Sequence, residues 1–298
     1  MPPPDHGPSQ TAAGVAWLRA AHQLLDDPPL ILTDPAIVAL LGADNVERLC
    51  SDPARLQSPG AQALRSHIVL RSRFAEDGLE AAAARGVRQY VILGAGYDTF
   101  IVRQPDWARA LRITEVDRPE TQAAKRARLA AANLTVPDNV TFAGIDFESE
   151  TLADGLHRHG VALDEPIFFS WLGVTMYLTG PAIDAVLRTV AGCSAGSEIV
   201  FTFAPARGES DHSHAGATLA ERAASVGEPW RTYFEPAALG KKLNDLAFGT
   251  VQFLTPAEAA ARYCANRTDG LPVPRRTTIV RAINDVLPPR DDLPAERP

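Results

Sequence analysis

Residues 90–100 read YVILGAGYDTF, and this stretch decides the fold class that the sequence predicts. An apolar run ends at Gly94-Ala95-Gly96, as in a strand that turns sharply into the next element. Glycine lets the backbone approach a ligand closely, and open α/β sheets bind ligands at the carboxyl ends of their strands. We therefore expect a first strand with a binding loop at its tip. A plain glycine turn is the alternative, because a bare G-x-G is a weak motif.

Apolar runs of strand length alternate with helical segments from residue 89 to residue 204. They predict strands over 89–93, 112–117, 140–146, 166–172 and 198–204, and two late strands over 250–254 and 277–283. Such alternation is typical of a doubly wound parallel sheet. The expected fold is α/β, with a seven-stranded, mostly parallel sheet, helices on both faces and an antiparallel edge.

The chain before the first strand reads as helical. Apolar residues recur at helical spacing over 11–25, 35–41 and 59–84. We expect an N-terminal helical region, residues 11–85, that packs on a core formed by residues 86–285. A polar, turn-rich segment near 205–234 is expected to form a lid. The proline-rich ends, residues 1–10 and 286–298, are expected to be flexible tails.

Composition excludes several classes of protein. The 298 residues carry a formal net charge of -7, which argues against nucleic acid as a partner, since phosphate binding needs a basic surface. No apolar stretch approaches the roughly 20 residues that span a bilayer, and the N-terminus lacks the features of a signal peptide. We therefore expect a cytoplasmic protein with no membrane partner.

Cysteine and histidine spacing predicts neither a disulfide framework nor a metal site. Cys50, Cys193 and Cys264 show no paired spacing, and we expect all three to be buried as small apolar residues. His212 and His214 stand close together in a polar segment without an evident third ligand. Catalytic metal sites commonly need three protein ligands, so no metal is expected.

The glycine loop departs from the dinucleotide fingerprint. G-x-G-x-x-G would require a third glycine at position 99, where the chain has Thr99. Asp98 would also place negative charge near a pyrophosphate. These two residues count against a nicotinamide-dependent reductase, which stays open as the weakest alternative.

The next two strands end in acids. Asp117 ends the second strand 21 positions after Gly96, where an acid accepts hydrogen bonds from ribose hydroxyls. Asp146 ends the third strand, where a carboxylate can accept from an adenine amine while Phe147 packs on the ring. Taken singly, Asp117 also suits a helix N-cap and Asp146 a turn. Together they indicate a nucleoside ligand without phosphate, such as S-adenosylmethionine.

Longer stretches resemble the leucine carboxyl methyltransferase family, and more closely a bacterial branch of S-adenosylmethionine-dependent methyltransferases. The resemblance rests on LGAGYDTFIVR (93–103), EVDRPETQAAKR (115–126) and GEPWRTYF (227–234). It implies a class I methyltransferase fold that binds S-adenosylmethionine. It further implies Arg71 for the methionine carboxylate, the loop 94–96, Asp117 for the ribose and Asp146-Phe147 for the adenine. Asp98 fits beside the amino-acid part of such a ligand.

Two residues depart from the family pattern. Phe147 stands where leucine is usual, which is a conservative change. Leu172 stands where the family often has a glutamate, so the contribution of that acid is missing or is supplied elsewhere.

Two arginines precede the loop in the chain, and we ask which of them points toward the sheet. Arg71 and Arg73 lie on one expected helix and point about 200° apart, so only one can face the sheet. The family pattern favours Arg71, whereas the alternative is that both are solvated. Arg103 is a candidate partner for Asp98 that would brace the loop.

Methyl transfer from a sulfonium is an in-line displacement that depends mainly on alignment. A carboxylate acceptor is ionised at neutral pH and needs no base, whereas an alcohol or phenol needs one. The acceptor region should follow the fourth and fifth strands, and its polar or aromatic candidates are Tyr177, His212, His214, Trp230, Arg231 and Tyr233. Tyr177 has the best claim to the mouth of the pocket and is our candidate catalytic residue.

The sequence shows no evident general base. This favours an O-methyltransferase that acts on a carboxylate, or on a hydroxyl, of a small molecule. The alternative, motivated by Leu172, is a non-catalytic protein that binds S-adenosylmethionine or a nucleoside on the same fold. The N-terminal helices can cover either a pocket or a partner, so a homodimer is a further expectation.

Overall fold

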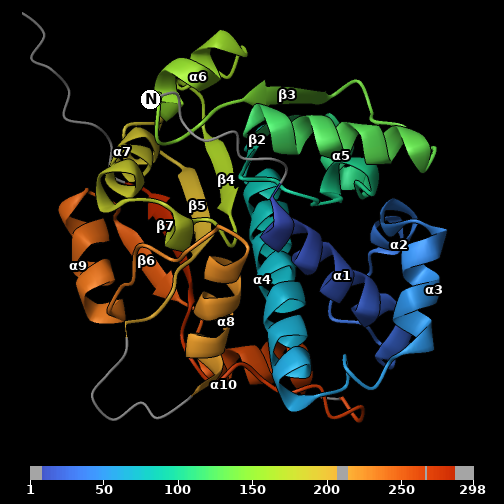
Figure 1. Cartoon of the computed structure of the whole chain (residues 1–298). Helices are drawn as coiled ribbons and strands as arrows, with labels where there is room; N and C mark the ends of the chain where they lie inside the picture. Colours follow the sequence, from blue (N-terminus) through green and yellow to red (C-terminus); the bar gives the residue numbers. More distant parts are fainter. Residues whose placement is uncertain (1–8, 207–213, 266, 286–298) are drawn as a thin grey trace, which may run out of the picture.

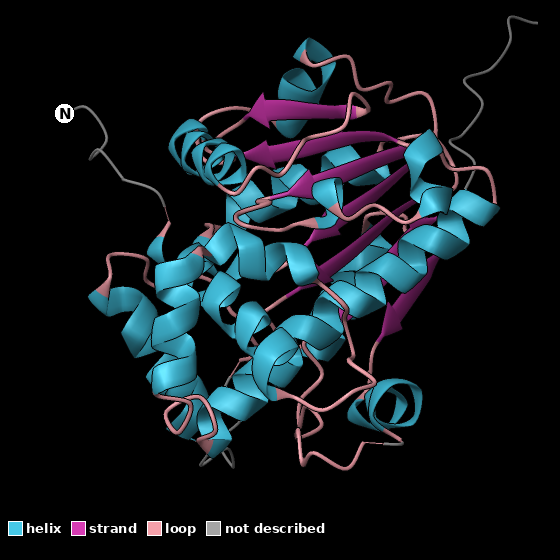
Figure 2. Ribbon diagram, turned by 90° about the vertical axis from the view of Figure 1, so that its right-hand side faces the viewer, coloured by secondary structure: helices cyan, strands magenta, loops and turns pink. Residues whose placement is uncertain are grey.

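A seven-stranded sheet forms the centre of the computed structural model, which describes residues 9–206, 214–265 and 267–285. The strands are β1 (Gln89–Leu93), β2 (Arg112–Asp117), β3 (Val140–Gly144), β4 (Ile167–Trp171), β5 (Ser197–Thr202), β6 (Thr250–Phe253) and β7 (Ile279–Asn284). Their order in the sheet is β3-β2-β1-β4-β5-β7-β6. Figure 2 shows these strands fanned into one twisted sheet that is flanked by helices. The expected α/β fold is thereby confirmed.

The edge of the sheet formed by the last two strands is antiparallel, as expected, although the strand that runs against all the others, β7, lies inside the sheet. The pairs from β3 to β5 are all parallel, and β7 is antiparallel to both β5 and β6. The edge strand is therefore β6, which alternates between exposed and half-buried residues. Strand β7 is mostly buried and pairs with β5 along its whole length, which explains its place inside the sheet.

The helices are α1 (Gln10–Leu25), α2 (Pro35–Leu41), α3 (Ala43–Ser51), α4 (Pro59–Ala84), α5 (Pro119–Ala131), α6 (Leu152–Arg158), α7 (Gly180–Ala191), α8 (His214–Ser225), α9 (Pro236–Asp245) and α10 (Pro256–Ala259). Three 3-10 turns (Phe100–Val102, Asp106–Ala110, Thr175–Tyr177) and a π-helical turn (Ala260–Cys264) complete the described elements. Figure 1 shows α1, α2 and α3 grouped beside α4, away from α6, α7 and α9. No helix in the described ranges is long and apolar enough to cross a bilayer.

Alternating side chains of the central strands belong to two separate hydrophobic cores. Tyr90 and Ile92 of β1 pack with the N-terminal helices, whereas Val91 and Leu93 pack with α6, α7 and α9. This follows from the two-residue period of a strand. Strands β1 and β4 are buried along their whole length, as expected for a parallel sheet with helices on both faces.

Several boundaries differ from the expectation. Helix α1 begins at Gln10, and the Ser9 hydroxyl caps it by accepting from the backbone N–H of Ala12 at 3.1 Å, so the expected first tail is too long. The remainder of that tail, and the expected tail 286–298, lie outside the described residues. Helix α3 was not expected. Cys50 lies on it and is exposed, so the expectation of three buried cysteines is wrong there, whereas Cys193 is buried and Cys264 half-buried.

Candidate functional site

A cavity of about 2210 Å³ opens at the carboxyl ends of β1, β2 and β4. A site for one small ligand typically measures about 300–1,000 Å³, so this cavity has room for two molecules. In Figure 2 the arrowheads of the parallel strands point toward a group of helices. All of the site residues expected from the sequence line it, namely Arg71, Gly94, Ala95, Gly96, Asp98, Asp117, Asp146, Phe147 and Tyr177.

The glycine loop requires glycine for steric reasons. Gly94 and Gly96 have φ of 64° and 50°, in the left-handed region that disfavours other residues. A Cβ atom on Gly94 would lie 2.3 Å from Cγ2 of Val174. The loop is therefore held close to the segment that follows β4, and its backbone faces the cavity.

Asp117 ties this loop to the end of β2. Its Oδ2 accepts from the backbone N–H of Gly96 at 2.6 Å, and its Oδ1 accepts from the backbone N–H of Arg118 at 2.8 Å. Burial raises the pKa of Asp117 although these two bonds oppose the shift. Each carboxylate oxygen keeps a second lone pair, so the group can still accept from a diol in the cavity.

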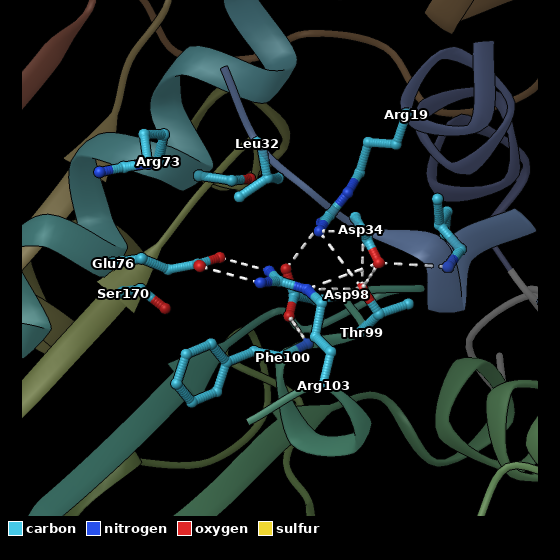
Figure 3. A network of polar contacts seen from close by, with 12 residues as sticks. Arg19, Leu32, Asp34, Arg73, Glu76, Asp98, Thr99, Phe100, Arg103 and Ser170 are labelled. Carbon is cyan, nitrogen blue, oxygen red and sulfur yellow. Dashed lines mark hydrogen bonds and ion pairs between the residues drawn. The ribbon is translucent and has the colours of Figure 1, made fainter. Parts of the chain in front are cut away.

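Asp98 is held by a cation that the sequence analysis missed. Arg19 of α1 donates to Oδ2 of Asp98 at 2.7 Å and to Oδ2 of Asp34 at 2.7 Å, and Figure 3 shows this network. Burial alone would raise the pKa of Asp98, but the nearby cations, Arg19 first, hold it well below its usual range. The loop thus carries a fixed negative charge at the cavity wall.

Arg103 is not the partner of Asp98, so that expectation is wrong. Its guanidinium turns toward Glu76 of α4 (Figure 3), to which it donates at 2.9 Å, and its Nε donates to Thr99 Oγ1 at 3.1 Å. The 3-10 turn after the loop points Arg103 at α4. Arg19 was detectable as a lone cation in the apolar run of residues 11–25.

Arg71 is the inward member of the arginine pair on α4. Its side chain lines the cavity and is only 9% exposed, whereas Arg73 is 48% exposed and donates to Asp77 at 2.6 Å. Its Nε is buried and has no acceptor within the described part of the chain. Burial lowers the pKa of Arg71 to about 10. A buried, unpartnered guanidinium fits a ligand carboxylate, which it can bind in a bidentate manner.

Gly173, in the turn after β4, makes room for this guanidinium. A Cβ atom there would lie 2.8 Å from each of the two terminal nitrogens of Arg71, and φ is 77°. The next residue back, Leu172, also lines the cavity and packs against the core. Hydrocarbon therefore occupies the place of the family glutamate.

The third strand ends earlier than expected, so Asp146 lies on the loop after β3. Its Oδ1 accepts from the backbone N–H of Glu148 at 3.0 Å. The Phe147 ring packs edge-on against Trp171, with ring centroids 6.1 Å apart. The carboxylate and the ring nevertheless both line the cavity, as an adenine site would require.

The second region of the cavity contains the acceptor candidates. Tyr177 is half-buried and lines it from its 3-10 turn. Trp230 also lines it, and its buried Nε1 has no acceptor among the described residues. His212 and the side chain of His214 lie outside the described residues, and no metal-binding cluster of His, Cys, Asp or Glu occurs among the residues that are described.

The side chains of the acceptor candidates at positions 231 and 233 are more exposed to solvent. Arg231 has its guanidinium 3.9 Å from the Glu148 carboxylate, and Tyr233 is 44% exposed. Both line the cavity. They lie at its rim, where a substrate would enter, so neither has the burial expected of a group that performs chemistry.

His67 is a second residue that the sequence analysis missed. It precedes Arg71 by one helical turn on α4 and lines the same cavity. Burial, together with the charge of Arg71, lowers the pKa of His67 to about 3. The imidazole is therefore neutral at physiological pH. Its i, i+4 spacing from Arg71 was the available signal.

The segment that we expect to form a lid is bound to the start of α1 through Glu228. The Glu228 carboxylate accepts from the backbone N–H groups of Gln10 and Thr11 at 3.1 and 3.2 Å, and from the Ser9 hydroxyl at 3.2 Å. A carboxylate at a helix N-terminus satisfies free N–H groups and complements the helix dipole. Residues 207–213 of the expected lid lie outside the described residues.

Comparison with known proteins identifies the family of this chain. A model of the leucine carboxyl methyltransferase family matches residues 12–191, which include most of α1, the glycine loop and the ends of β2, β3 and β4. The chain belongs to the leucine carboxyl methyltransferase family. Family membership confirms the resemblance seen in the sequence and removes the nicotinamide-reductase alternative.

Relatives within the leucine carboxyl methyltransferase family span most of the chain. The "Putative S-adenosyl-L-methionine-dependent methyltransferase YktD" of Bacillus subtilis is 32% identical over 241 residues, which cover 78% of each chain. A similarly named protein of Mycobacterium marinum is 31% identical over 229 residues, covering 74% of this chain and 71% of its own. The structure of a "putative methyltransferase" from Thermobifida fusca superposes with a TM-score of 0.57 at 19% identity, covering 96% of this chain and 99% of its own. This last likeness shows the class I methyltransferase fold.

Proposed function

We propose that this protein transfers the methyl group of S-adenosylmethionine to an oxygen of a small molecule, and that this oxygen belongs to a carboxylate. Membership of the family makes the chain an S-adenosylmethionine-dependent methyltransferase. The acceptor is the part that we infer. The observation that carries the inference is a cavity with room for two molecules in which the described inward titratable groups include no base suited to neutral pH.

The described residues fit the cofactor at four places. Arg71 offers to a carboxylate a buried guanidinium whose Nε has no acceptor among the described residues, and the φ values of the glycine loop allow close approach of the ligand. Asp117 has lone pairs free for a ribose diol, and Asp146 with Phe147 offers an acceptor and a ring for the adenine. When bound, S-adenosylmethionine supplies a methyl group that its sulfonium has already activated.

The absence of a suitable base favours a carboxylate as acceptor. A general base works best when its pKa lies near the operating pH. His67 has a pKa of about 3, so it is a poor base for an alcohol. A carboxylate arrives ionised and needs only hydrogen-bond donors that hold one oxygen while the other attacks. The Trp230 indole N–H, the Tyr177 hydroxyl and a neutral His67 N–H are such donors in the cavity. In this proposal Tyr177 contacts the acceptor as a donor.

The test separates cofactor binding from the chemistry. Calorimetry with S-adenosylhomocysteine should show binding to the wild type and at least tenfold weaker binding to Asp117→Ala, since a ribose acceptor and the loop brace are both lost. Incubation with methyl-labelled cofactor and a metabolite extract should then label a product that releases labelled methanol in mild base. Methyl esters hydrolyse under these conditions, whereas ethers and N-methyl groups do not. A base-stable label would contradict the carboxylate acceptor.

A non-catalytic binding protein is the second candidate. The observation that favours it is the hydrocarbon side chain of Leu172 in the place of the family glutamate. Such a protein would bind S-adenosylhomocysteine but label no compound in the extract. Labelled transfer to any acceptor would exclude it.

The remaining expectations belong to the same proposal. We propose a cytoplasmic enzyme that acts on a small molecule without nucleic acid or membrane, and a homodimer as its assembly. The acidic net charge of -7 supports the first point. Sedimentation at several protein concentrations would test the second, because a single monomeric species throughout would contradict a dimer.

A further inference from the structure

The cavity extends well beyond the residues assigned to the cofactor. Helix α4 gives the scale, because Arg71 and Gly60 both line the cavity and lie eleven residues apart on the same helix. At 1.5 Å per residue this corresponds to roughly 16 Å. A carboxylate held at Arg71 cannot reach the residues near Gly60, and the expected ribose and adenine residues lie on the strand tips. The far end of the cavity therefore serves another ligand.

Charge is divided unevenly along the cavity. Seven carboxylates line it in the described part of the chain, and Asp52 is the one of these that lies at the far end. The other six belong to the cofactor end or to the lid: Glu76, Asp98, Asp117, Asp146, Glu148 and Glu228. Arg48 and Arg55, which precede the start of α4 in the chain, line the far end instead, and Arg275 lines the same cavity. A group of three cations with one nearby carboxylate is unusual in a chain whose net charge is -7.

These three arginines come from separate segments and are free to bind a ligand. Arg48 lies on α3, Arg55 in the turn between α3 and α4, and Arg275 shortly before β7. All three are exposed. Their guanidinium groups form none of the ion pairs found among the described residues, although Asp52 lies on the same rim. Three cations therefore line one cavity, and the described residues neutralise them little.

The cavity wall between its two ends is apolar on two helices. Trp17 and Leu18 line it from α1, and Leu64 and Ile68 line it from α4 between Gly60 and Arg71. A ligand that reaches from the methyl donor to the arginines must cross this stretch. It therefore needs a hydrocarbon middle and an anionic end.

We propose that the methyl acceptor is an elongated molecule with a hydrocarbon middle, whose far end carries an anionic group bound by Arg48, Arg55 and Arg275. This inference rests on the proposed function, because it describes the acceptor of that reaction. Guanidinium groups bind carboxylates and phosphates in the same planar, bidentate manner, so the shared chemistry is an oxyanion. The methylated oxygen lies at the opposite end of the molecule, near Arg71.

The experiment measures binding of four probes of equal chain length to the protein saturated with S-adenosylhomocysteine. Decanoate and decyl phosphate carry the anion, and decan-1-ol and decylamine are the neutral and cationic matches. Saturation occupies Arg71 and so removes it as a partner for the anionic probes, while the arginine variants described next separate binding at the far end from binding at the donors of Trp230, Tyr177 and His67. We expect at least one anionic probe to bind about tenfold more tightly than decan-1-ol, and decylamine to bind no better than decan-1-ol. The stronger of the two anionic probes identifies a carboxylate or a phosphate as the natural end group.

Matched variants show whether the arginines are responsible. Combined replacement of Arg48, Arg55 and Arg275 by glutamine should abolish the preference for an anion and leave binding of decan-1-ol unchanged. The control replaces three exposed arginines outside the cavity by glutamine, which changes the net charge equally; they are Arg109, Arg158 and Arg188. This control should keep the preference. Equal binding of anion and alcohol to the wild type, or a preference that survives the first triple variant, would overturn the proposal.

The readouts distinguish this inference from the proposed function. If the anion preference depends on the arginines but no base-labile methyl product forms, the proposed function fails and the anionic end site stands. If a methyl ester forms but the probes show no preference for an anion, the proposed function stands and the anionic end site fails. Affinity for S-adenosylhomocysteine should be the same in both triple variants and in the wild type, because none of the replaced residues lies at the cofactor end.

Discussion

Replacement of Gly173 by alanine tests the role of Arg71 without removing its charge. The added Cβ would lie 2.8 Å from both terminal nitrogens of the Arg71 guanidinium and 3.0 Å from its Cζ. Real Cβ atoms do not approach other atoms so closely, so the guanidinium must move. The side chain is buried and its Nε has no acceptor among the described residues, so the substitution breaks no hydrogen bond between Arg71 and another described residue in the free protein.

The expected magnitudes follow from two separate effects. A non-glycine residue in the left-handed region costs roughly 1–2 kcal/mol, and Gly173 has φ of 77°. We therefore expect a loss of that size in the free energy of unfolding. Displacement of Arg71 should also remove a charge-assisted bond to the ligand carboxylate, which contributes about 1.5–3 kcal/mol. At about 1.4 kcal/mol per factor of ten, the affinity for S-adenosylhomocysteine should fall by roughly 10- to 100-fold.

Gly160 provides a matched control. Its φ is 74°, and a Cβ atom there would meet nothing within 4 Å. Gly160→Ala should show the same loss of stability in urea unfolding and wild-type affinity in calorimetry. If Gly173→Ala binds S-adenosylhomocysteine as tightly as the wild type does, Arg71 does not hold the carboxylate. If both variants lose affinity equally, the effect arises from backbone strain and the reasoning also fails.

Three further perturbations test the described contacts. Arg19→Met breaks a buried pair with two carboxylates and should cost about 3–5 kcal/mol in urea unfolding, whereas Arg73→Met breaks a half-exposed pair and should cost less than about 1 kcal/mol; equal losses would contradict the network. The pKa of His67 is about 3 in the folded state and about 6.5 in the unfolded state, so the folded state binds fewer protons and stability falls as the pH drops below about 6.5. Between pH 7.5 and pH 5, His67→Phe should therefore lose about 2 kcal/mol less unfolding free energy than the wild type, and an equal loss in both proteins would contradict a neutral imidazole at position 67. Glu228→Gln weakens the bond between the lid and α1 and should speed release of S-adenosylhomocysteine several-fold in stopped flow, while the exposed Glu221→Gln should leave the release rate unaltered; equal rates in both variants would show that the lid contact does not limit release.

The strands of the sheet could be predicted from the sequence because each strand is marked by the residues within it and beside it. Strands β1 and β4 are short apolar runs bounded by glycine or proline, which is the pattern of a buried parallel strand. Asp117 stands at the end of such a run, so its place at the carboxyl edge followed directly. The insertion of β7 between β5 and β6 could not be read in this way. Periodicity identifies a strand, but the choice of its neighbour depends on contacts between segments far apart in the chain.

The polar network at the loop was missed for the same reason. Arg19 and Asp98 are 79 positions apart, and their contact depends on how α1 crosses the sheet tip. The pairing of Asp98 with Arg103 looked plausible because the two residues are close in sequence. In the structure the 3-10 turn directs Arg103 toward Glu76, 27 positions earlier. Proximity along the chain is a poor guide to ion pairs outside regular helices.

Helix α1 connects the loop and the lid, and the two contacts differ in strength. Arg19 is almost fully buried between Asp98 and Asp34, so removing one partner leaves an unpaired charge away from water. Glu228 binds the first turn of α1 at the half-exposed rim, where water can replace its hydrogen bonds at little cost. The lid contact therefore breaks at a much lower free energy than the loop contact. We therefore expect ligands to enter past Glu228 while α1 keeps the glycine loop and Asp98 in place for the cofactor.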